Sequence, residues 1–251
     1  MTCSLEGKKA LVTGGSRGIG RAIALALADA GVDVAVASRK MPDLERVAEE
    51  IKGRGREAIA VPAHVGRLDQ ISEMVEKVRN VFGTIDILVN NAATNPTMAQ
   101  AIDVDERGWD SIMNLNLKGL FFTSQYVARI MGERGGGSII NVSSVEGITP
   151  GILPVYSISK AGVIFATKVM ARQWAHMNIR VNCIAPGLTR TEFSRALWDN
   201  PDILGAALTM TPMGRIGEPE EMTGAVLFFA SDASSGYVTG QVLAVDGGNT
   251  I

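Results

Sequence analysis

The sequence predicts an α/β protein in which helices cover both faces of one doubly wound, parallel sheet of seven strands. Three observations support this fold class. Short apolar runs alternate with helical patterns along the chain, the runs are continuous rather than alternating, and a glycine-rich turn joins the first run to the first helix. Continuous apolar strands are typical of parallel sheets that are buried on both faces. The 251 residues suffice for one such domain.

Seven short apolar runs, bounded by turn or helix signals, are predicted to be buried strands. They are residues 10–13, 32–37, 58–62, 85–90, 138–143, 179–185 and 242–245. Apolar residues at helical spacing fill most of the intervals between them. The predicted helices are residues 18–30, 43–52, 70–82, 106–131, 155–175 and 220–230. No linker, repeat or low-complexity segment interrupts this alternation, which indicates one domain over residues 1–251.

The composition argues against several classes of function. The 24 Lys and Arg residues are scattered and balanced by 26 Asp and Glu, so no basic groove for nucleic acid is expected. No apolar run is long enough to span a bilayer, and the N-terminus has no signal-peptide pattern. The only two histidines, His64 and His176, are widely separated, so we expect no metal site.

A glycine-rich turn follows the first predicted strand and opens the first predicted helix. Glycine lets a backbone turn tightly and approach a pyrophosphate, which then lies at the positive end of the helix. The spacing is G-x-x-x-G-x-G, and the alternative is a tight connection that binds nothing. Because the turn begins a strand–helix–strand unit, we predict a dinucleotide site. Its expected contacts are Gly14, Ser16, Arg17, Gly18, Ile19 and Gly20.

The end of the second predicted strand bears on which dinucleotide is bound. An acidic residue at this place would hold the ribose hydroxyls of NAD, but the chain has Ser38 and Arg39. The Arg39 guanidinium suits a 2′-phosphate, and Arg17 in the glycine turn is a second candidate cation. The alternative is that both arginines are solvated surface residues. We therefore predict NADP(H) as the cofactor in preference to NAD(H).

Tyr156 and Lys160 lie four residues apart in the predicted helix 155–175, so their side chains share one face. The reference pKa of a phenol, near ~10, is too high for a base at neutral pH. A cation about 4 Å away contributes roughly 4 kcal/mol at an effective dielectric of ~20, or about three pKa units. The pair is thus a candidate proton donor and acceptor. Taken alone, the spacing also fits an ordinary tyrosine and lysine.

Taken together, the motifs resemble the short-chain dehydrogenase/reductase family over essentially the whole chain. Besides the glycine turn and Tyr156-x-x-x-Lys160, the matching pieces are Asn90-Asn-Ala92, Asn114-Leu-Asn116, Asn141-Val-Ser-Ser144, Arg180-Val-Asn-Cys-Ile-Ala-Pro186-Gly187 and the C-terminal Gly240-Gln-Val-Leu-Ala-Val-Asp-Gly-Gly. The resemblance implies a Rossmann-type domain. It also implies an oxidoreductase that interconverts a ketone or aldehyde with an alcohol by hydride transfer.

The same resemblance assigns catalytic roles to four residues. Ser143, thirteen residues before Tyr156, would bind the substrate carbonyl, and we prefer it to Ser144, which would point to the opposite side of an extended backbone. Tyr156 would act as the acid and base. Lys160 would hold the nicotinamide ribose and lower the pKa of Tyr156. Asn116 would fix a water in a proton relay to Lys160.

Further cofactor contacts are implied after the fourth and sixth strands. They are Asn90, Ala92, Pro186, Gly187 and Thr191, with Thr189 as the second choice for the last position.

Two positions depart from the family pattern. His64-Val65 stands where the family has an Asp-Val pair whose carboxylate accepts from the adenine amino group, although the Val65 backbone remains as a contact. Ala93 replaces the glycine that follows Asn-Asn-Ala.

Residues 188–215 break the regular pattern and are predicted to form a helical flap over the site. Its apolar side chains predict a largely apolar carbonyl or alcohol substrate; the alternative is that they serve packing or subunit contact. Motif details resemble NADPH-dependent carbonyl and retinal reductases. A 3-oxoacyl-(acyl-carrier-protein) reductase is the nearest alternative, and a non-catalytic nucleotide-sensing scaffold is a remote one.

Assembly and compartment are also predicted. The helices 106–131 and 155–175 are apolar around more than one face, so a second subunit is expected to cover them. The family resemblance implies a homotetramer; the alternative is a monomer with unusually thick cover. The peroxisomal members of the carbonyl-reductase branch end in a targeting tripeptide, whereas this chain ends Gly-Asn-Thr-Ile. We therefore predict a cytoplasmic protein.

Overall fold

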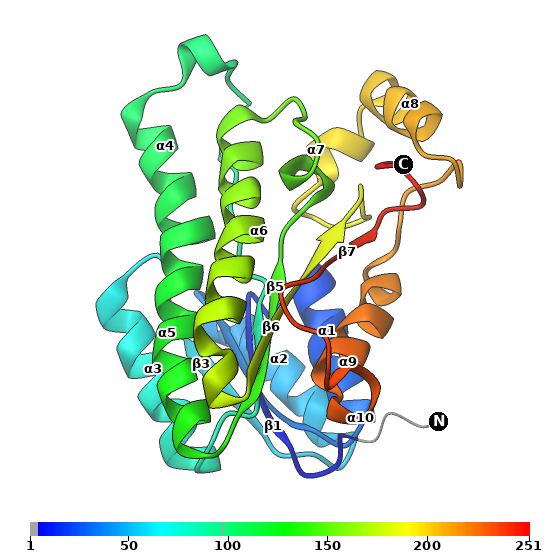
Figure 1. The fold of residues 1–251 in the computed structure, drawn as a ribbon. Helices are drawn as coiled ribbons and strands as arrows, with labels where there is room; N and C mark the ends of the chain where they lie inside the picture. Colours follow the sequence, from blue (N-terminus) through cyan, green and yellow to red (C-terminus); the bar gives the residue numbers. More distant parts are fainter. Residues whose placement is uncertain (1–4, 97) are drawn as a thin grey trace.

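Seven parallel strands form one sheet in the computed structural model, which describes residues 5–96 and 98–251 (Figure 1). The order across the sheet is β3-β2-β1-β4-β5-β6-β7, and every neighbouring pair is parallel. The predicted fold class is confirmed. The strands are β1 (Lys9–Thr13), β2 (Asp33–Ser38), β3 (Ala58–Pro62), β4 (Ile87–Asn90), β5 (Gly137–Val142), β6 (Ile179–Pro186) and β7 (Val242–Val245).

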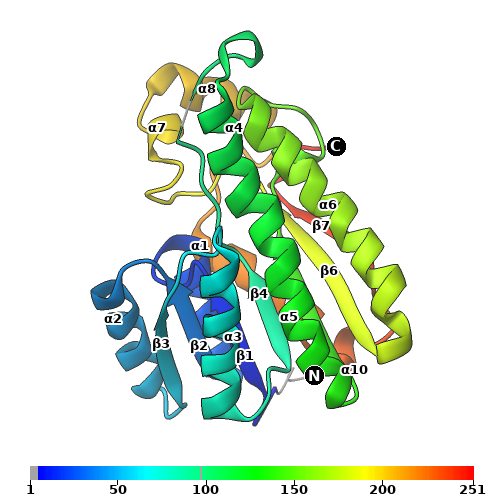
Figure 2. The same cartoon turned by 90° about the vertical axis from the view of Figure 1, so that its left-hand side faces the viewer.

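Helices cover both faces of the sheet, as the continuous apolar strands predict (Figures 1 and 2). On one face, apolar side chains of α1 (Gly18–Asp29), α2 (Met41–Lys52) and α9 (Thr223–Ala230) join the strands in one core. On the other, α3 (Leu68–Phe82), α5 (Leu120–Glu133) and α6 (Pro154–Trp174) form a second core. The doubly wound arrangement follows from these two apolar clusters.

The long helix predicted over residues 106–131 is divided. It consists of α4 (Glu106–Met113), a π-helical segment η2 (Asn114–Gly119) and α5. At Gly119 a Cβ atom would lie 2.0 Å from the Val65 carbonyl oxygen, so glycine allows this helix to touch the segment after β3. A π-helical turn widens a helix locally and redirects its side chains. Here the widened turn contains Asn116.

The segment predicted as a flap contains two short helices, α7 (Arg195–Trp198) and α8 (Pro201–Met210), beyond the C-terminal ends of the strands (Figure 1). The C-terminal end of the flap segment is held by the C-terminal tail of the chain, because the Met213 amide donates to the Gly247 carbonyl over 3.1 Å. The remaining short elements are η1 (Ala101–Asp103), η3 (Val145–Gly147), η4 (Ala175–Met177), η5 (Pro219–Met222) and α10 (Asp232–Ser235). None of the described helices combines the length and apolar character that crossing a membrane requires.

β1 and β4 are neighbours in the centre of the sheet, and the chain leaves them toward opposite edges. Open α/β sheets bind ligands at this switch point, beyond the carboxyl ends of the strands. The glycine turn follows β1 here and the Asn90-Asn-Ala92 motif ends β4, so the topology brings two of the predicted motifs together.

Candidate active site

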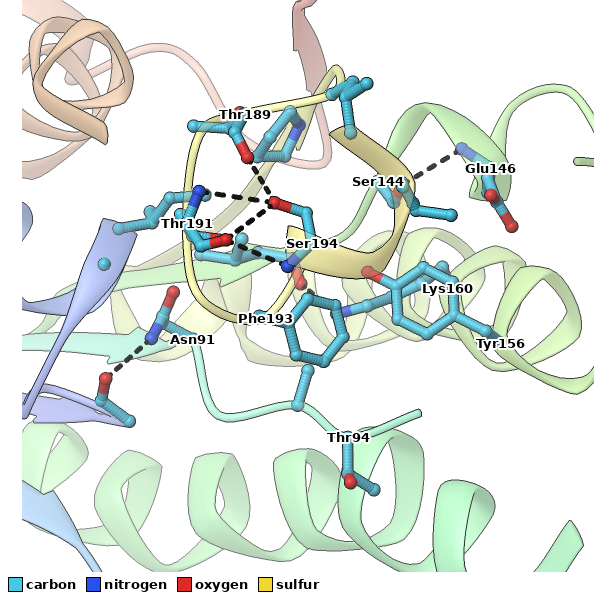
Figure 3. Close-up of a pocket in the computed structure, with 18 of the residues that line it drawn as sticks. Asn91, Thr94, Ser144, Glu146, Tyr156, Lys160, Thr189, Thr191, Phe193 and Ser194 are labelled. Carbon is cyan, nitrogen blue, oxygen red and sulfur yellow. Dashed lines mark hydrogen bonds between the residues drawn. The ribbon is translucent and has the colours of Figure 1, made fainter. Parts of the chain in front are cut away.

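A cavity of about 790 Å³ lies over the carboxyl ends of the strands, large enough for a dinucleotide and a small substrate together. Three parts of the chain supply most of its lining: the glycine turn with the ends of β2, β3 and β4; the segment from β5 to α6; and the flap. Figure 3 shows how side chains from the last two parts face one another across it. Leu115 of η2 and Asn249 of the C-terminal tail complete the lining. Among the described residues, no group of His, Cys, Asp and Glu side chains could hold a metal ion.

The glycine turn is fixed from behind by the Asn90-Asn-Ala92 segment. The Asn91 side chain donates to the carbonyls of Thr13 and Gly14, each over 3.1 Å, and the Asn91 amide donates to the Thr13 hydroxyl. At Gly20 a Cβ atom would lie 2.2 Å from the Gly14 carbonyl oxygen. These close contacts require glycine, because any side chain there would open the turn.

The first turn of α1 fits an anionic ligand. Its N-cap residue, Arg17, makes no side-chain cap, and no acidic residue lies in the first turn. The first N–H groups of a helix need partners, and a phosphate supplies them at the positive end of the helix dipole. The turn therefore fits the pyrophosphate of a nucleotide cofactor.

Most predicted cofactor contacts lie on the cavity wall. The residues on the wall are Gly14, Ser16, Arg17, Gly18, Ile19, Gly20, Ser38, Arg39, His64, Val65, Ala92, Pro186, Gly187, Thr189 and Thr191. Asn90 is the exception. Its side chain is buried on the α5 side of the sheet, where it donates to Ser124 Oγ over 2.8 Å and to Asn141 Oδ1 over 3.0 Å. Asn90 thus supports the turn from within the core and does not reach the cavity.

Tyr156 and Lys160 both project from α6 and are almost completely buried. The Lys160 ammonium lies 5.5 Å from the centre of the Tyr156 ring and donates to the Val142 carbonyl at the end of β5, over 2.7 Å. Phe193 of the flap packs on Tyr156 with ring centres 6.0 Å apart (Figure 3). The predicted pair is therefore assembled at the cavity, beneath the flap.

The electrostatics of the pair differ from the prediction. Burial raises the pKa of Tyr156, the Glu146 carboxylate raises it further, and only the hydrogen bond with Ser144 lowers it. Burial also lowers the pKa of Lys160 to about 8. The four-residue spacing predicted a lowered pKa for Tyr156, but burial is the largest effect on the phenol and raises its pKa instead, and burial likewise lowers the pKa of Lys160. Tyr156 is consequently protonated, and able to donate, throughout the neutral range.

Ser144, and not the predicted Ser143, is the serine beside the Tyr156 hydroxyl. Ser143 is buried and donates to the Lys160 carbonyl over 2.8 Å. Ser144 is half-buried on the cavity wall, accepts the Glu146 amide over 3.2 Å, and is hydrogen-bonded to Tyr156. The choice of Ser143 is therefore corrected.

The physical reason for this correction is the alternation of side chains along β5 and its continuation. Asn141 and Ser143 contact the side of the sheet that carries α6, where Asn141 donates to Thr167. Both serines line the cavity, but the Ser144 side chain points the other way and is the one hydrogen-bonded to Tyr156. The same alternation is the reason for rejecting Ser144 from the sequence, but alternation alone does not say which of two neighbouring side chains faces the site.

Asn116 ties two segments together instead of lining the cavity. Its side chain accepts from the Thr94 amide over 2.8 Å and donates to the Thr94 carbonyl over 3.0 Å and to Ser159 Oγ over 3.1 Å. It therefore joins the loop after β4 to α6, one residue before Lys160. The π-helical segment turns Asn116 toward both partners.

The flap side of the cavity is organised around Ser194. Its hydroxyl lies 2.9 Å from Thr191 Oγ1 and contacts the Thr189 carbonyl (Figure 3). Trp198 Nε1 donates to the Thr191 carbonyl over 3.0 Å. Thr189 Oγ1 donates to the Gly187 carbonyl over 2.9 Å. Both predicted threonines thus lie on the wall, in a network that ties the start of the flap to β6.

Glu146 is a site residue that the sequence reasoning missed. One of its carboxylate oxygens accepts from Ser157 Oγ over 2.8 Å, and the carboxylate also accepts from the Leu153 amide. At Gly151 a Cβ atom would lie 2.5 Å from the carboxyl carbon. Burial raises the pKa of Glu146. The carboxylate therefore anchors the loop between Ser144 and Tyr156, a role that no local motif indicates.

Comparison with known proteins agrees with this geometry. Residues 14–250 match the family model described as Enoyl-(Acyl carrier protein) reductase. The chain is 40% identical over 246 residues to Dehydrogenase/reductase SDR family member 4 of Bos taurus, covering 98% of this chain and 88% of the relative. It is 43% identical over 249 residues to the 3-oxoacyl-(acyl-carrier-protein) reductase FabG of Thermotoga maritima, covering 98% and 99%. A solved structure from Agrobacterium tumefaciens with bound NADP has a TM-score of 0.89 and 37% identity, covering 98% of each chain.

Proposed function

The chain belongs to the short-chain dehydrogenase/reductase family, and on this premise we propose that it is an NADP(H)-dependent oxidoreductase for an apolar, uncharged ketone or aldehyde and the corresponding alcohol. One observation carries the proposal: the hydroxyls of Ser144 and Tyr156 meet at the cavity, with Lys160 buried behind them.

A bound nicotinamide cofactor would supply the hydride for reduction, or take it up in oxidation. In reduction, the protonated Tyr156 would donate its proton to the carbonyl oxygen as that oxygen gains charge. Ser144 would donate a hydrogen bond to the same oxygen, which is the arrangement that stabilises developing negative charge. Lys160, held on the Val142 carbonyl, would keep the Tyr156 environment fixed and add positive charge below its pKa of about 8.

The preference for NADP(H) rests on the charges near the end of β2. Arg39 and Arg17 both line the cavity there. Of the two nearest acidic residues in the sequence, Asp33 pairs with Lys9 and Arg56 at the opposite end of β2, whereas Asp43 lines the cavity and pairs with Arg46 over 3.4 Å. A 2′-phosphate would therefore meet two guanidinium groups, and the carboxylate on this wall, Asp43, already has a cationic partner in Arg46.

The preference for an uncharged substrate rests on the flap. Each of the three arginines in residues 188–215 has a carboxylate partner: Arg190 with Glu218 at 3.0 Å, Arg215 with Glu221 at 2.6 Å, and Arg195 with Glu192 and Asp199. The substrate end of the cavity is lined instead by apolar groups such as Ile152, Phe193 and Leu197. An anionic substrate would have to break an ion pair to gain a cationic partner.

The similarity to FabG favours a second candidate, reduction of a 3-oxoacyl thioester carried by an acyl-carrier protein. A basic docking surface near the flap would support it. The pairing of the same three arginines weighs against such a surface. A panel that includes an acetoacetyl thioester separates the two candidates.

A homotetramer in the cytoplasm completes the proposal. On α6, Phe165 and Ile158 expose 69% and 49% of their surface, and a second subunit packed on this helix would cover them. Light scattering after size exclusion is expected to give about four times the 26.6 kDa of one chain. A mass of one chain would contradict the assembly without bearing on the chemistry.

The deciding experiment compares NADPH and NADH oxidation by the pure protein with apolar ketones, aromatic aldehydes, α-dicarbonyls and an acetoacetyl thioester. We expect NADPH-dependent turnover of the uncharged ketones. Tyr156→Phe should reduce the rate by about a thousandfold, whereas Tyr126→Phe, on α5 away from the cavity, should not. Arg39→Ala should raise the Kd of NADPH about tenfold and leave that of NADH unchanged. Tight NADPH binding without turnover of any carbonyl would favour a nucleotide-sensing scaffold instead.

A further inference from the structure

His64 lies at the end of the cavity that a purine base would occupy. In dinucleotide sites of this topology the pyrophosphate lies at the glycine turn and the adenosine ribose at the end of β2. β3 is the next strand outward, and His64 follows it. His64 and Arg39 line this end together, and both also line an adjoining hollow of about 250 Å³. The base would therefore lie against His64.

Two contacts fix the orientation of His64. Its amide donates to Gln70 Oε1 over 2.7 Å, and its ring Nδ1 accepts the Gly66 amide over 3.1 Å. A Cβ atom on Gly66 would lie 2.9 Å from His64 Cε1, so glycine is needed for the ring to lie against this backbone. Main chain and ring are thus both held in place.

The Gly66 contact also decides what the ring can offer to a ligand. An imidazole whose Nδ1 accepts a hydrogen bond carries its proton on Nε2. Nε2–H is therefore a donor, and within the described part of the chain it has no hydrogen-bond partner. His64 has no remaining acceptor. An adenine amino group, which only donates, gains nothing from it.

The geometry points to His64 as a hydrogen-bond donor to the purine ring, so that this site binds adenine and hypoxanthine dinucleotides with similar affinity. Adenine offers ring nitrogens as acceptors, and hypoxanthine offers a ring nitrogen and its carbonyl oxygen. A carboxylate at this position would accept from the amino group of adenine and repel the hypoxanthine oxygen. The inference rests on the proposed dinucleotide function and deepens it by naming which feature of the base is read.

The test is a binding measurement that needs no carbonyl substrate. Fluorescence titration gives the Kd of NADPH and of its deaminated, hypoxanthine-containing analogue, which carry the same reporter nicotinamide. For the unchanged protein we expect two Kd values within about threefold of each other. His64→Asp should favour the adenine form by about tenfold or more, the effect of one hydrogen bond to a charged acceptor. His64→Ala should weaken both forms by a similar factor.

The matched control is Asp110→Asn on α4, which changes the carboxylate on the wall of the adjoining hollow. It should leave the ratio of Kd values unchanged. Three results would each overturn the inference. The unchanged protein could bind the adenine and hypoxanthine forms with Kd values that differ tenfold or more. His64→Asp could leave the ratio of the two Kd values unaltered, or His64→Ala could bind both forms as tightly as the unchanged protein does. Repeating the ratio with NADH and its deaminated analogue separates this result from the 2′-phosphate preference. A lack of carbonyl turnover would refute the proposed reaction and leave the ratio interpretable.

Discussion

Replacing Ser144 and Ser143 separately by alanine distinguishes catalysis from packing at adjacent positions. Ser144 Oγ is hydrogen-bonded to the Tyr156 side chain on the cavity wall. Ser143 Oγ is buried and donates to the Lys160 carbonyl over 2.8 Å. The same atom is removed in both variants. Only Ser144→Ala removes a donor that can reach the oxygen of a substrate beside Tyr156.

Ser144→Ala should lose catalytic rate, whereas Ser143→Ala should lose stability. Loss of one donor to an oxygen that gains charge in the transition state costs about 10²- to 10³-fold in kcat, or about 3–4 kcal/mol. We expect this loss of kcat in Ser144→Ala. Its free energy of unfolding should change little, because Ser144 is half-buried. Ser143→Ala loses one buried hydrogen bond, about 1 kcal/mol of stability, which lowers Tm by about 2–4 °C in a chain of this size. Its kcat should stay within about threefold.

The assay combines steady-state NADPH oxidation with a ketone that the unchanged protein reduces, and differential scanning calorimetry of all three proteins. Equal NADPH affinity in a binding titration shows that the cofactor site is intact. The reverse pattern, with a hundredfold loss in Ser143→Ala and near-normal turnover in Ser144→Ala, would refute the reasoning from side-chain direction. It would restore the choice based on the thirteen-residue spacing.

Three further outcomes follow from single contacts. Glu146→Gln removes a charge that raises the pKa of Tyr156, so the rise of the alcohol-oxidation rate with pH should move to lower pH by up to about one unit. Glu192→Gln, at an exposed position, is the control. An unmoved pH profile in Glu146→Gln would contradict this reasoning. Gly20→Ala places a Cβ 2.2 Å from the Gly14 carbonyl oxygen and should lower the free energy of unfolding by about 2 kcal/mol, or Tm by about 4–8 °C. Gly205→Ala is the control and should not lower Tm, because a Cβ there meets open space. Trp198→Phe loses the 3.0 Å bond to the Thr191 carbonyl and should raise KM about fivefold with little change in kcat; a normal KM would argue against a positioned flap.

The sequence predicted the seven strands well because each is a short continuous apolar run, and burial on both faces leaves such a run few other structures. Helix ends were less well defined. The predicted helix 106–131 contains the π-helical segment around Asn116, which its apolar spacing does not reveal. That segment depends on the contact of Gly119 with the backbone after β3, far away in sequence.

The sequence by itself determined the fold class, the glycine turn and the pair Tyr156–Lys160, because periodicity, backbone freedom and four-residue spacing are local properties. Only the tertiary structure decided that Ser144 faces Tyr156, that Asn90 turns into the core, and that Glu146 anchors the loop before α6. It also decided the direction of the Tyr156 pKa, which the spacing alone had reversed. The reason is physical: orientation and desolvation depend on what packs around a side chain, and those neighbours come from distant segments of the chain.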